Sequence, residues 1–397
     1  MKLGICGWIL VKVTYSKLKY VVIRTISHSR ILTSAYFAFS PSYRREQRAL
    51  VSGLLSHMKD IKEDTSFFLL RRNIHRIEKG LVMPSRRPVF AAEYIGETVD
   101  YYLKALKNCG GVSREFDWAT DVLHQYFASV ESHPYVDKAR RAFLEIAPVE
   151  PGEAVPYKHG TVRSPVTNDE LLSLVRQRKS VRTFLQKPVP RELVDTALEI
   201  AALSPSSCNR QPTHYRIYDE GPLLREMARL PLGTAGFADN IPMICAVTGD
   251  LSAYFYERDR HSIYVDGCLS AMLFMLALET VGLASCPLNW AEIDSRDQRF
   301  EKMAGLLPHE RAIMFMAIGY PDPEGKVAYS AKKDLSALRS YNQASEAARR
   351  PELRDEVRTR VANWWRRLRK LVAPAAEDMT LFFILYESEL LALVRSH

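Results

Sequence analysis

A short polar run between residues 204 and 212 has the composition of a ligand-contacting turn. It reads Ser204-Pro205-Ser206-Ser207-Cys208-Asn209-Arg210-Gln211-Pro212. Pro205 ends the preceding helical pattern, because the proline ring disfavours helical geometry in the residue before it. The hydroxyl, amide and backbone N–H groups of such a turn can bind a flat, polar ligand, although an ordinary polar turn has the same composition.

A second segment, upstream of this turn, could hold an anion. It reads Arg178-Lys179-Ser180-Val181-Arg182-Thr183-Phe184 and precedes the helix that leads into the turn. Guanidinium groups form forked hydrogen bonds with phosphate oxygens. Arg178 and Arg182, with Ser180 between them, are therefore candidates for a phosphate site.

These two segments, in this order and at this spacing, resemble the FMN-dependent nitroreductase family. There, an Arg-x-Ser-x-Arg/Lys-x-Phe segment and a Pro-Ser-Ser-x-Asn-x-Gln-Pro turn bracket the first helix of the flavin fold. The resemblance covers roughly residues 165 to 340 and leaves out both ends of the chain. It implies an α+β fold, a nitroreductase-like sandwich of a central mixed or antiparallel sheet with helices. Further motifs that carry it are Asp266-Gly267, Gly282-Leu283-Ala284-Ser285-Cys286-Pro287 and Gly319-Tyr320-Pro321.

The resemblance also implies an FMN site shared by two subunits of a homodimer. The first segment and a basic pair after the last strand would hold the phosphate and ribityl chain, and the polar turn would reach the isoalloxazine of the partner's cofactor. A backbone N–H near Leu288 or Asn289 would donate to flavin N5. The implied cofactor-binding residues are Arg178, Lys179, Ser180, Arg182, Pro205, Ser206, Ser207, Asn209, Pro287, Leu288, Asn289, Lys332 and Lys333.

Three of these assignments leave alternatives open. Lys332 and Lys333 could equally be a solvated charge run. Asn289 and Trp290 are bulkier than the glycine-rich version usual in the family, which bears on the size of the accepted substrate, and Trp290 could instead belong to the core. The segment Phe237 to Asn240 and the aromatic cluster from Tyr254 to Tyr256 could line the pocket mouth or simply pack.

The implied activity is that of an FMN-dependent NAD(P)H oxidoreductase. Reduced nicotinamide would pass a hydride to flavin N5 and leave, and a nitroaromatic, quinone or similar acceptor would follow in a ping-pong cycle. Because the cofactor carries this chemistry, no side-chain acid is required. The chain has no Gly-x-Ser-x-Gly elbow, dinucleotide fingerprint or P-loop. Its sequence does not identify the acceptor or the choice between NADH and NADPH.

A binding or scaffold protein is the alternative function. It would have the flavin fold and little turnover, and it would be docked to a membrane or a biosynthetic assembly. Bound FMN without turnover would favour this interpretation. Nucleic-acid binding through the basic ends is a third hypothesis, but the chain has no recognisable module for it.

The elements before the flavin-like region are predicted to be helical. Residues 1–150 read as a helical extension of unknown role, residues 151–165 as a Pro- and Gly-rich linker, and residues 341–397 as a basic helical tail. One helix is predicted over residues 67–81, with Gly80 as its C-cap. We expect the core, residues 166–340, to bind flavin without the first 150 residues.

Hydrophobic periodicity predicts the elements of that core. Thr167 and Glu170 form a capping box ahead of one helix, and a second helix starts after Pro190. The run from Tyr264 to Val281 is hydrophobic almost all round, so it must be covered on every side by a large core or by a second copy. Strands are predicted at residues 215–218, 241–247 and 312–318.

Composition fits a soluble globular chain of two to three domains, with 397 residues of which 47% are hydrophobic and 25% charged. The six cysteines show no C-x-x-C pairing, which argues against a zinc site and a disulfide framework, so a reducing cytoplasm is the expected location. The apolar run from Leu3 to Val13 is shorter than the ~20 residues that span a bilayer. No transmembrane span is predicted.

Much of the net charge of +9 lies at the two ends. Basic ends favour an anionic membrane surface, nucleic acid or an acidic partner, and solvated faces are the plainer explanation. Val21, Val22, Ile26 and Ile31 fit a helical stripe, so the basic N-terminal region could make peripheral contact with a membrane. A helix packed on the rest of the protein, or a loose arm, is the alternative.

Overall fold

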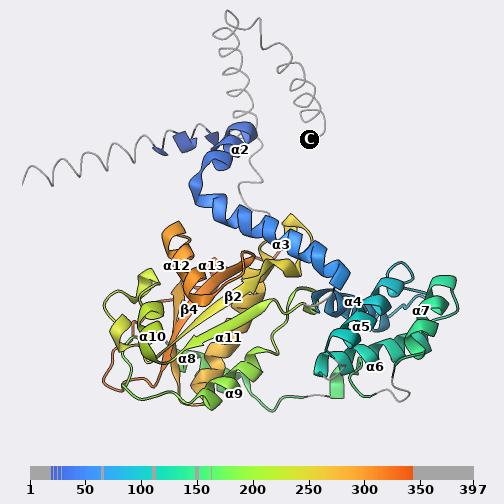
Figure 1. Cartoon of the computed structure of the whole chain (residues 1–397). Helices are drawn as coiled ribbons and strands as arrows, with labels where there is room; N and C mark the ends of the chain where they lie inside the picture. Colours follow the sequence, from blue (N-terminus) through green and yellow to red (C-terminus); the bar gives the residue numbers. More distant parts are fainter. Residues whose placement is uncertain are drawn as a thin grey trace, which may run out of the picture. The chain divides into compact units, whose positions relative to one another are not determined.

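The computed structural model describes residues 19–20, 22–24, 26–27, 29–63, 67–109, 113–147, 152–161 and 163–342 (Figure 1). The chain divides into two compact units. Residues 40–329 form the larger unit, and residues 1–39 together with 330–397 form the smaller one. In the smaller unit the described helices are α2 (Arg30–Phe39) and α13 (Leu335–Leu338).

A four-stranded antiparallel sheet is the centre of the flavin-like part of the larger unit. Its strands are ordered β1-β2-β4-β3, so β3 is an edge strand. The inner strand β2 is buried along almost its whole length, which explains its continuous apolar sequence. The strands are β1 (Thr213–Tyr218), β2 (Met243–Asp250), β3 (Ala284–Asn289) and β4 (Glu310–Gly319).

Side chains alternate between the two faces of the sheet along each strand. Since both sets are apolar in β2 and β4, helices cover both faces. Ile244, Ala246 and Phe315 pack with α10 (Gly221–Ala228) and α12 (Asp294–Ala304). On the other face, α9 (Arg191–Ala201) and α11 (Ser262–Thr280) pack with Met243, Cys245 and Met316. The predicted α+β sandwich is confirmed.

Helix α11 is apolar on nearly all sides and is long and apolar enough to cross a membrane, yet half of that stretch is buried in the fold. It is therefore the core helix of the sandwich. Gly267 allows its close approach to β4, since a Cβ there would lie 2.3 Å from Ile313. The opposite side of α11 is exposed and carries Val265, Leu269 and Met272.

The described residues of the front of the chain are mainly helical, and the last four helices share a core of their own (Figure 1). Helix α4 runs one residue past Gly80, so the predicted C-cap at that glycine is wrong. Gly80 is instead a packing position, because a Cβ there would lie 2.2 Å from the Phe90 ring. The helices are α3 (Arg44–Glu63), α4 (Phe68–Leu81), α5 (Ile95–Cys109), α6 (Arg114–Ser129) and α7 (Pro134–Leu144).

Two of these front helices pack directly on the flavin-like part. Ala49 of α3 and Phe68 of α4 belong to one buried apolar cluster with Leu251, Ala253 and Ile263. His57 of α3 is buried, and its Nδ1 lies 2.7 Å from the Ser252 carbonyl oxygen. The front helices and the sheet therefore belong to one unit, while the boundaries predicted from sequence stay predictions.

Candidate functional site

The cationic segment follows helix α8 (Asn168–Gln177). The predicted capping box starts this helix: the Glu170 N–H donates to Thr167 Oγ1 at 3.2 Å, and the Thr167 N–H donates to Glu170 Oε2 at 2.7 Å. Arg178 is the C-cap of the helix. The chain then extends, and Val181 donates its N–H to the Ser285 carbonyl at 3.1 Å. A bridge between Ser180 and Ser285 thus joins this segment to the edge strand β3.

Both arginines of the segment lie near the start of β3. Burial raises the pKa of the Cys286 thiol, and the charges of Arg182 and Arg178 oppose this rise. Among the described residues, Arg178 Nε and Ser285 Oγ are buried without a hydrogen-bond partner. A buried donor without a partner is costly, so Arg178 Nε and Ser285 Oγ are candidates for contact with a polar ligand.

The free edge of β3 offers a particular backbone donor. Residues of a strand alternate in the side to which their N–H and C=O point. The Ser285 carbonyl accepts a hydrogen bond from the Val181 N–H. The backbone N–H and C=O groups of residues 285, 287 and 289 therefore point away from β4. Pro287 has no backbone N–H, and proline is for that reason largely confined to edge strands. Of Leu288 and Asn289, the alternation therefore selects the Asn289 N–H as the outward donor, and the Leu288 side chain is buried.

The polar turn, Pro205 to Gln211, is backbone-strained and firmly held. Cys208, Asn209 and Gln211 have φ values of 52°, 53° and 55°, in the left-handed region that non-glycine residues seldom adopt. Such conformations persist only where the surroundings enforce them, and they gather at ligand clamps. The Ser206 hydroxyl accepts the Gln211 N–H at 3.0 Å. Ser206, Ser207 and Asn209 remain half-buried.

Asp266 of α11 anchors this turn. Its buried carboxylate accepts the Ser207 N–H at 3.1 Å on Oδ1 and 3.0 Å on Oδ2, and the Tyr254 hydroxyl at 2.7 Å. Tyr254 is therefore a support for the turn and not an exposed lid residue. Arg210 lies over the Tyr254 ring at 5.0 Å. Its carbonyl accepts a hydrogen bond from Arg71 of α4 at 3.4 Å, so a front helix also contacts the turn.

The cationic segment and the polar turn are at opposite ends of α11. The turn is fixed at Asp266, whereas Gln177, next to Arg178, donates to Glu279 at 3.1 Å. Burial raises the pKa of the Glu279 carboxyl, and the charge of Arg178 opposes this rise. Asp266 and Glu279 are 13 residues apart in one helix, which corresponds to about 20 Å at a rise of about 1.5 Å per residue. Within one protomer, the cationic segment therefore lies next to β3, whereas the polar turn lies away from both.

Lys332 and Lys333 belong to the smaller unit, and both are exposed. Their assignment to the cofactor phosphate stays a prediction. Lys179 and Arg182 are exposed at the end of α8, and Pro205 is exposed at the start of the turn. Among the described residues, no ion pair joins Arg178, Lys179 or Arg182 to a carboxylate.

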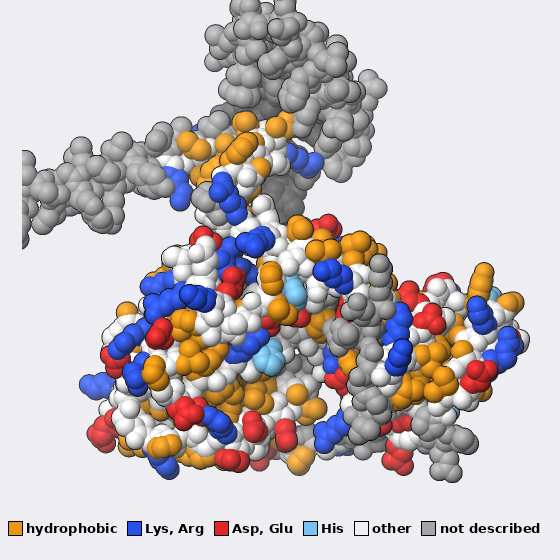
Figure 2. Space-filling view, viewed as in Figure 1, with side chains coloured by type: hydrophobic (Ala, Val, Ile, Leu, Met, Phe, Trp, Pro, Cys, Tyr) orange, Lys and Arg blue, Asp and Glu red, His pale blue; other side chains and the backbone are white. Residues whose placement is uncertain are grey.

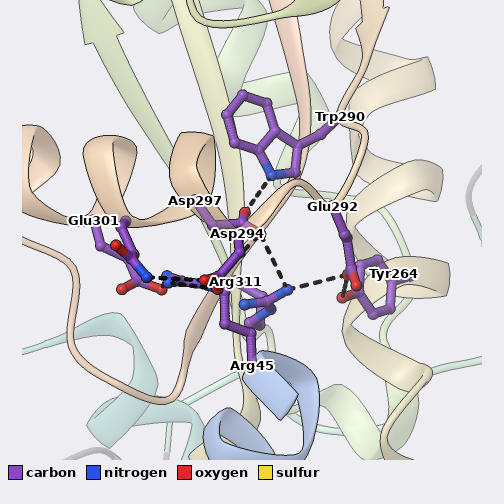
Figure 3. Close-up of polar contacts among 9 residues, drawn as sticks. Arg45, Tyr264, Trp290, Glu292, Asp294, Asp297, Glu301 and Arg311 are labelled. Carbon is purple, nitrogen blue, oxygen red and sulfur yellow. Dashed lines mark hydrogen bonds and ion pairs between the residues drawn. The ribbon is translucent and has the colours of Figure 1, made fainter. Parts of the chain in front are cut away.

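Trp290 belongs to the core, which was the alternative left open by the sequence. It is buried, stacks on Phe315 with ring centroids 4.8 Å apart, and donates its indole N–H to Asp297 at 2.7 Å. Burial raises the pKa of the Asp297 carboxyl, while Arg311 and Arg45 oppose that rise. Figure 3 shows these two arginines converging on the carboxylates of Glu292, Asp294, Asp297 and Glu301.

This cluster was not predicted, since Arg45 is far from α12 in sequence and no motif marks it. It joins the start of α3 to α12 and β4. A separate cavity of about 840 Å³ is lined by Phe237 to Asn240, together with Gln186, Arg229 and Arg296. None of the cofactor-binding residues implied by the resemblance lines it.

Comparisons with known proteins agree with the motifs. The model of the Nitroreductase family matches residues 175–233 and 221–320. A protein of Archaeoglobus fulgidus named "Putative NADH dehydrogenase/NAD(P)H nitroreductase" is 26% identical over 167 residues, which are 39% of this chain and 88% of that protein. Human iodotyrosine deiodinase 1 is 20% identical over 220 residues, 47% of this chain and 74% of that protein.

Solved structures described as nitroreductases are also similar to this chain. An FMN-dependent nitroreductase of Clostridium difficile is 20% identical, with a TM-score of 0.38, over 44% of this chain and 99% of its own. A Desulfovibrio desulfuricans protein solved in complex with FMN is 20% identical, with a TM-score of 0.38, over 46% and 99%. The Nitroreductase family model therefore matches residues 175–320, less than half of the chain, and the curated relatives support an oxidoreductase.

Proposed function

We propose that this protein is an FMN-dependent NAD(P)H oxidoreductase that works as a homodimer and reduces a nitroaromatic, quinone or similar acceptor. The observation that carries the proposal is the junction of the cationic segment with the free edge of β3. There, Ser180, which stands between Arg178 and Arg182 in the sequence, forms a bridge to Ser285. Arg178 Nε and Ser285 Oγ are buried without a hydrogen-bond partner among the described residues, and the Asn289 N–H points outward along the same strand. These groups suit a ligand with an anionic tail and a polar ring edge.

Each group has a role in holding such a cofactor. Arg178 and Arg182 would neutralise the phosphate, and Ser180 would add a hydroxyl hydrogen bond. The Asn289 N–H would donate to the ring edge near N5 and favour negative charge there. When bound, FMN supplies the hydride transfer chemistry.

The second half of the site would come from the partner subunit. Within one chain the polar turn is about 20 Å from the cationic segment along α11, too far to complete the same pocket. The exposed stripe of Val265, Leu269 and Met272 on α11 repeats every three or four residues, which suits packing against a second copy. A two-fold dimer would then bring each polar turn to the ring bound by the other chain.

The proposal is tested by measuring FMN binding to the full chain. Arg178→Ala should weaken FMN binding by about 10- to 100-fold, since it removes a charged hydrogen-bond donor to phosphate. Arg176→Ala is the matched control, because Arg176 is exposed on α8 one residue before Gln177. Equal FMN affinities for the two variants would refute the phosphate assignment.

The dimer and the turnover are tested separately. Leu269→Lys should convert the dimer to a monomer by light scattering and abolish FMN retention, whereas Leu307→Lys, at an exposed position outside α11, should change neither. NAD(P)H oxidation with a quinone or nitroarene then measures activity. Tightly bound FMN without turnover would favour the alternative scaffold function.

A further inference from the structure

The N-terminal part of the chain has an unusual charge composition. The first 45 residues contain no Asp or Glu, and the first acidic residue is Glu46. Over the same stretch the chain carries eight Lys or Arg side chains, of which Arg45 pairs with carboxylates of α12. They are Lys2, Lys12, Lys17, Lys19, Arg24, Arg30, Arg44 and Arg45.

The described residues of this stretch also expose large apolar side chains. Helix α2 has no buried residue, and Phe39 is 80% exposed. Figure 2 shows these orange side chains gathered on α2, with blue basic side chains close by. A dense group of exposed apolar residues marks an interaction surface. The group comprises Tyr20, Val22, Ile23, Ile31, Leu32, Tyr36, Phe37 and Phe39.

We propose that residues 19–39 bind the surface of a membrane that contains anionic phospholipids. Charge decides between the candidate occupants of this surface. A second copy of the segment would bring like charges together without an acid to offset them, which is unfavourable. An anionic lipid surface attracts each Lys and Arg and accepts the apolar and aromatic side chains at the boundary of head groups and acyl chains.

The sequence contains a second basic stretch that could strengthen this contact. Residues 349–370 hold nine Lys or Arg against three Asp or Glu, with Trp364 and Trp365 among them. Tryptophan is enriched at membrane interfaces, and stable surface anchoring commonly needs two signals. These residues lie outside the described part of the chain, so the proposal rests on residues 19–39.

Flotation of the full chain with vesicles tests the proposal. The chain should float with phosphatidylglycerol vesicles and remain unbound with phosphatidylcholine vesicles, and added salt should release it. Replacing Lys19, Arg24 and Arg30 by Gln together should weaken binding at least about tenfold. The double variant Phe37→Ser, Phe39→Ser should weaken it as well.

The matched control is Tyr135→Ser with Leu144→Ser, which changes two exposed apolar residues of α7 and should bind like the unaltered chain. Circular dichroism checks that each variant is folded. The proposal is overturned if the full chain fails to float with phosphatidylglycerol, if both lipids bind it equally, or if the residue 19–39 variants bind as tightly as the control. Higher oligomers without lipid that the Phe37 and Phe39 changes abolish would also overturn it, in favour of a second copy.

Discussion

Asp266→Asn should loosen the polar turn while preserving the shape of its anchor. The carboxylate accepts the Ser207 N–H and the Tyr254 hydroxyl, and both bonds are charge-assisted. Hydrogen bonds to a charged group contribute about 1.5–3 kcal/mol, against about 1 kcal/mol for neutral ones. The amide keeps one acceptor oxygen and turns an NH₂ toward a donor, so the two bonds together should lose about 2 kcal/mol. Urea unfolding of the full chain measures this loss, and Asp195→Asn, at an exposed position on α9, is the control.

The same substitution can show whether the turn acts on the partner's cofactor. A heterodimer of an Asp266→Asn chain with an Arg178→Ala chain combines both defects in one site under the shared-site arrangement. The other site then has the intact Arg178 of the first chain and the intact turn of the second. Mixing the two unfolded chains and refolding them should therefore recover FMN binding at one of the two sites in each heterodimer, although each homodimer binds poorly.

The opposite outcome has an equally definite meaning. If each chain completed its own site, every site in the heterodimer would carry one defect, and mixing would recover nothing. Absence of recovery in a mixture that native mass spectrometry shows to contain heterodimers would refute the shared site. Normal FMN binding by Asp266→Asn alone, despite the loss of stability, would show that the turn does not contact the cofactor.

Two further predictions concern the junction of the front helices with the core. Burial lowers the pKa of His57 below its unfolded value near 6.5. The contribution of neutral His57 to the free energy of unfolding is therefore complete above pH 6.5 and is lost as the pH falls toward the lowered folded-state pKa. The urea midpoint of the full chain should therefore fall more steeply with acidification than that of His57→Gln. The contacts of α3 and α4 reverse the expectation from sequence that the core binds flavin without residues 1–150. Deleting these residues should give insoluble or FMN-free protein, because Ile263 and the turn at Arg210 lose their cover from α3 and α4; a soluble, FMN-loaded core would contradict this.

Much of the architecture could be predicted because it depends on local sequence. The capping box at Thr167 and Glu170, the buried strand β2 and the apolar helix α11 each follow from spacing or periodicity within a few turns of chain. The cationic segment was likewise recognisable from residue types. The assignment of Pro287, Leu288 and Asn289 on β3 to the same site came from the resemblance. The Ser180 to Ser285 bridge supports the proximity of the cationic segment to this strand.

Other features depend on contacts that sequence separation hides. Gly80 looked like a helix end, because a glycine after an apolar helical run commonly is one. Its actual constraint is the Phe90 ring, which the chain brings back ten residues later. The cluster of Arg45 with α12 joins residues some 250 positions apart. Neither periodicity nor motif carries information about such pairs.

The front helices illustrate how this limit affects function. Their sequence reads as a separate helical extension, because each helix is amphipathic and no motif ties it to flavin. In the fold, Arg71 of α4 donates to the carbonyl of Arg210, and Arg210 in turn donates to the Ser207 carbonyl at 3.2 Å. Ser207 is the residue that Asp266 holds from α11. The strained turn is therefore held by hydrogen bonds with α11 on one side and with α4 on the other. Residues outside the family match thus help to set the geometry of the proposed flavin-contacting turn.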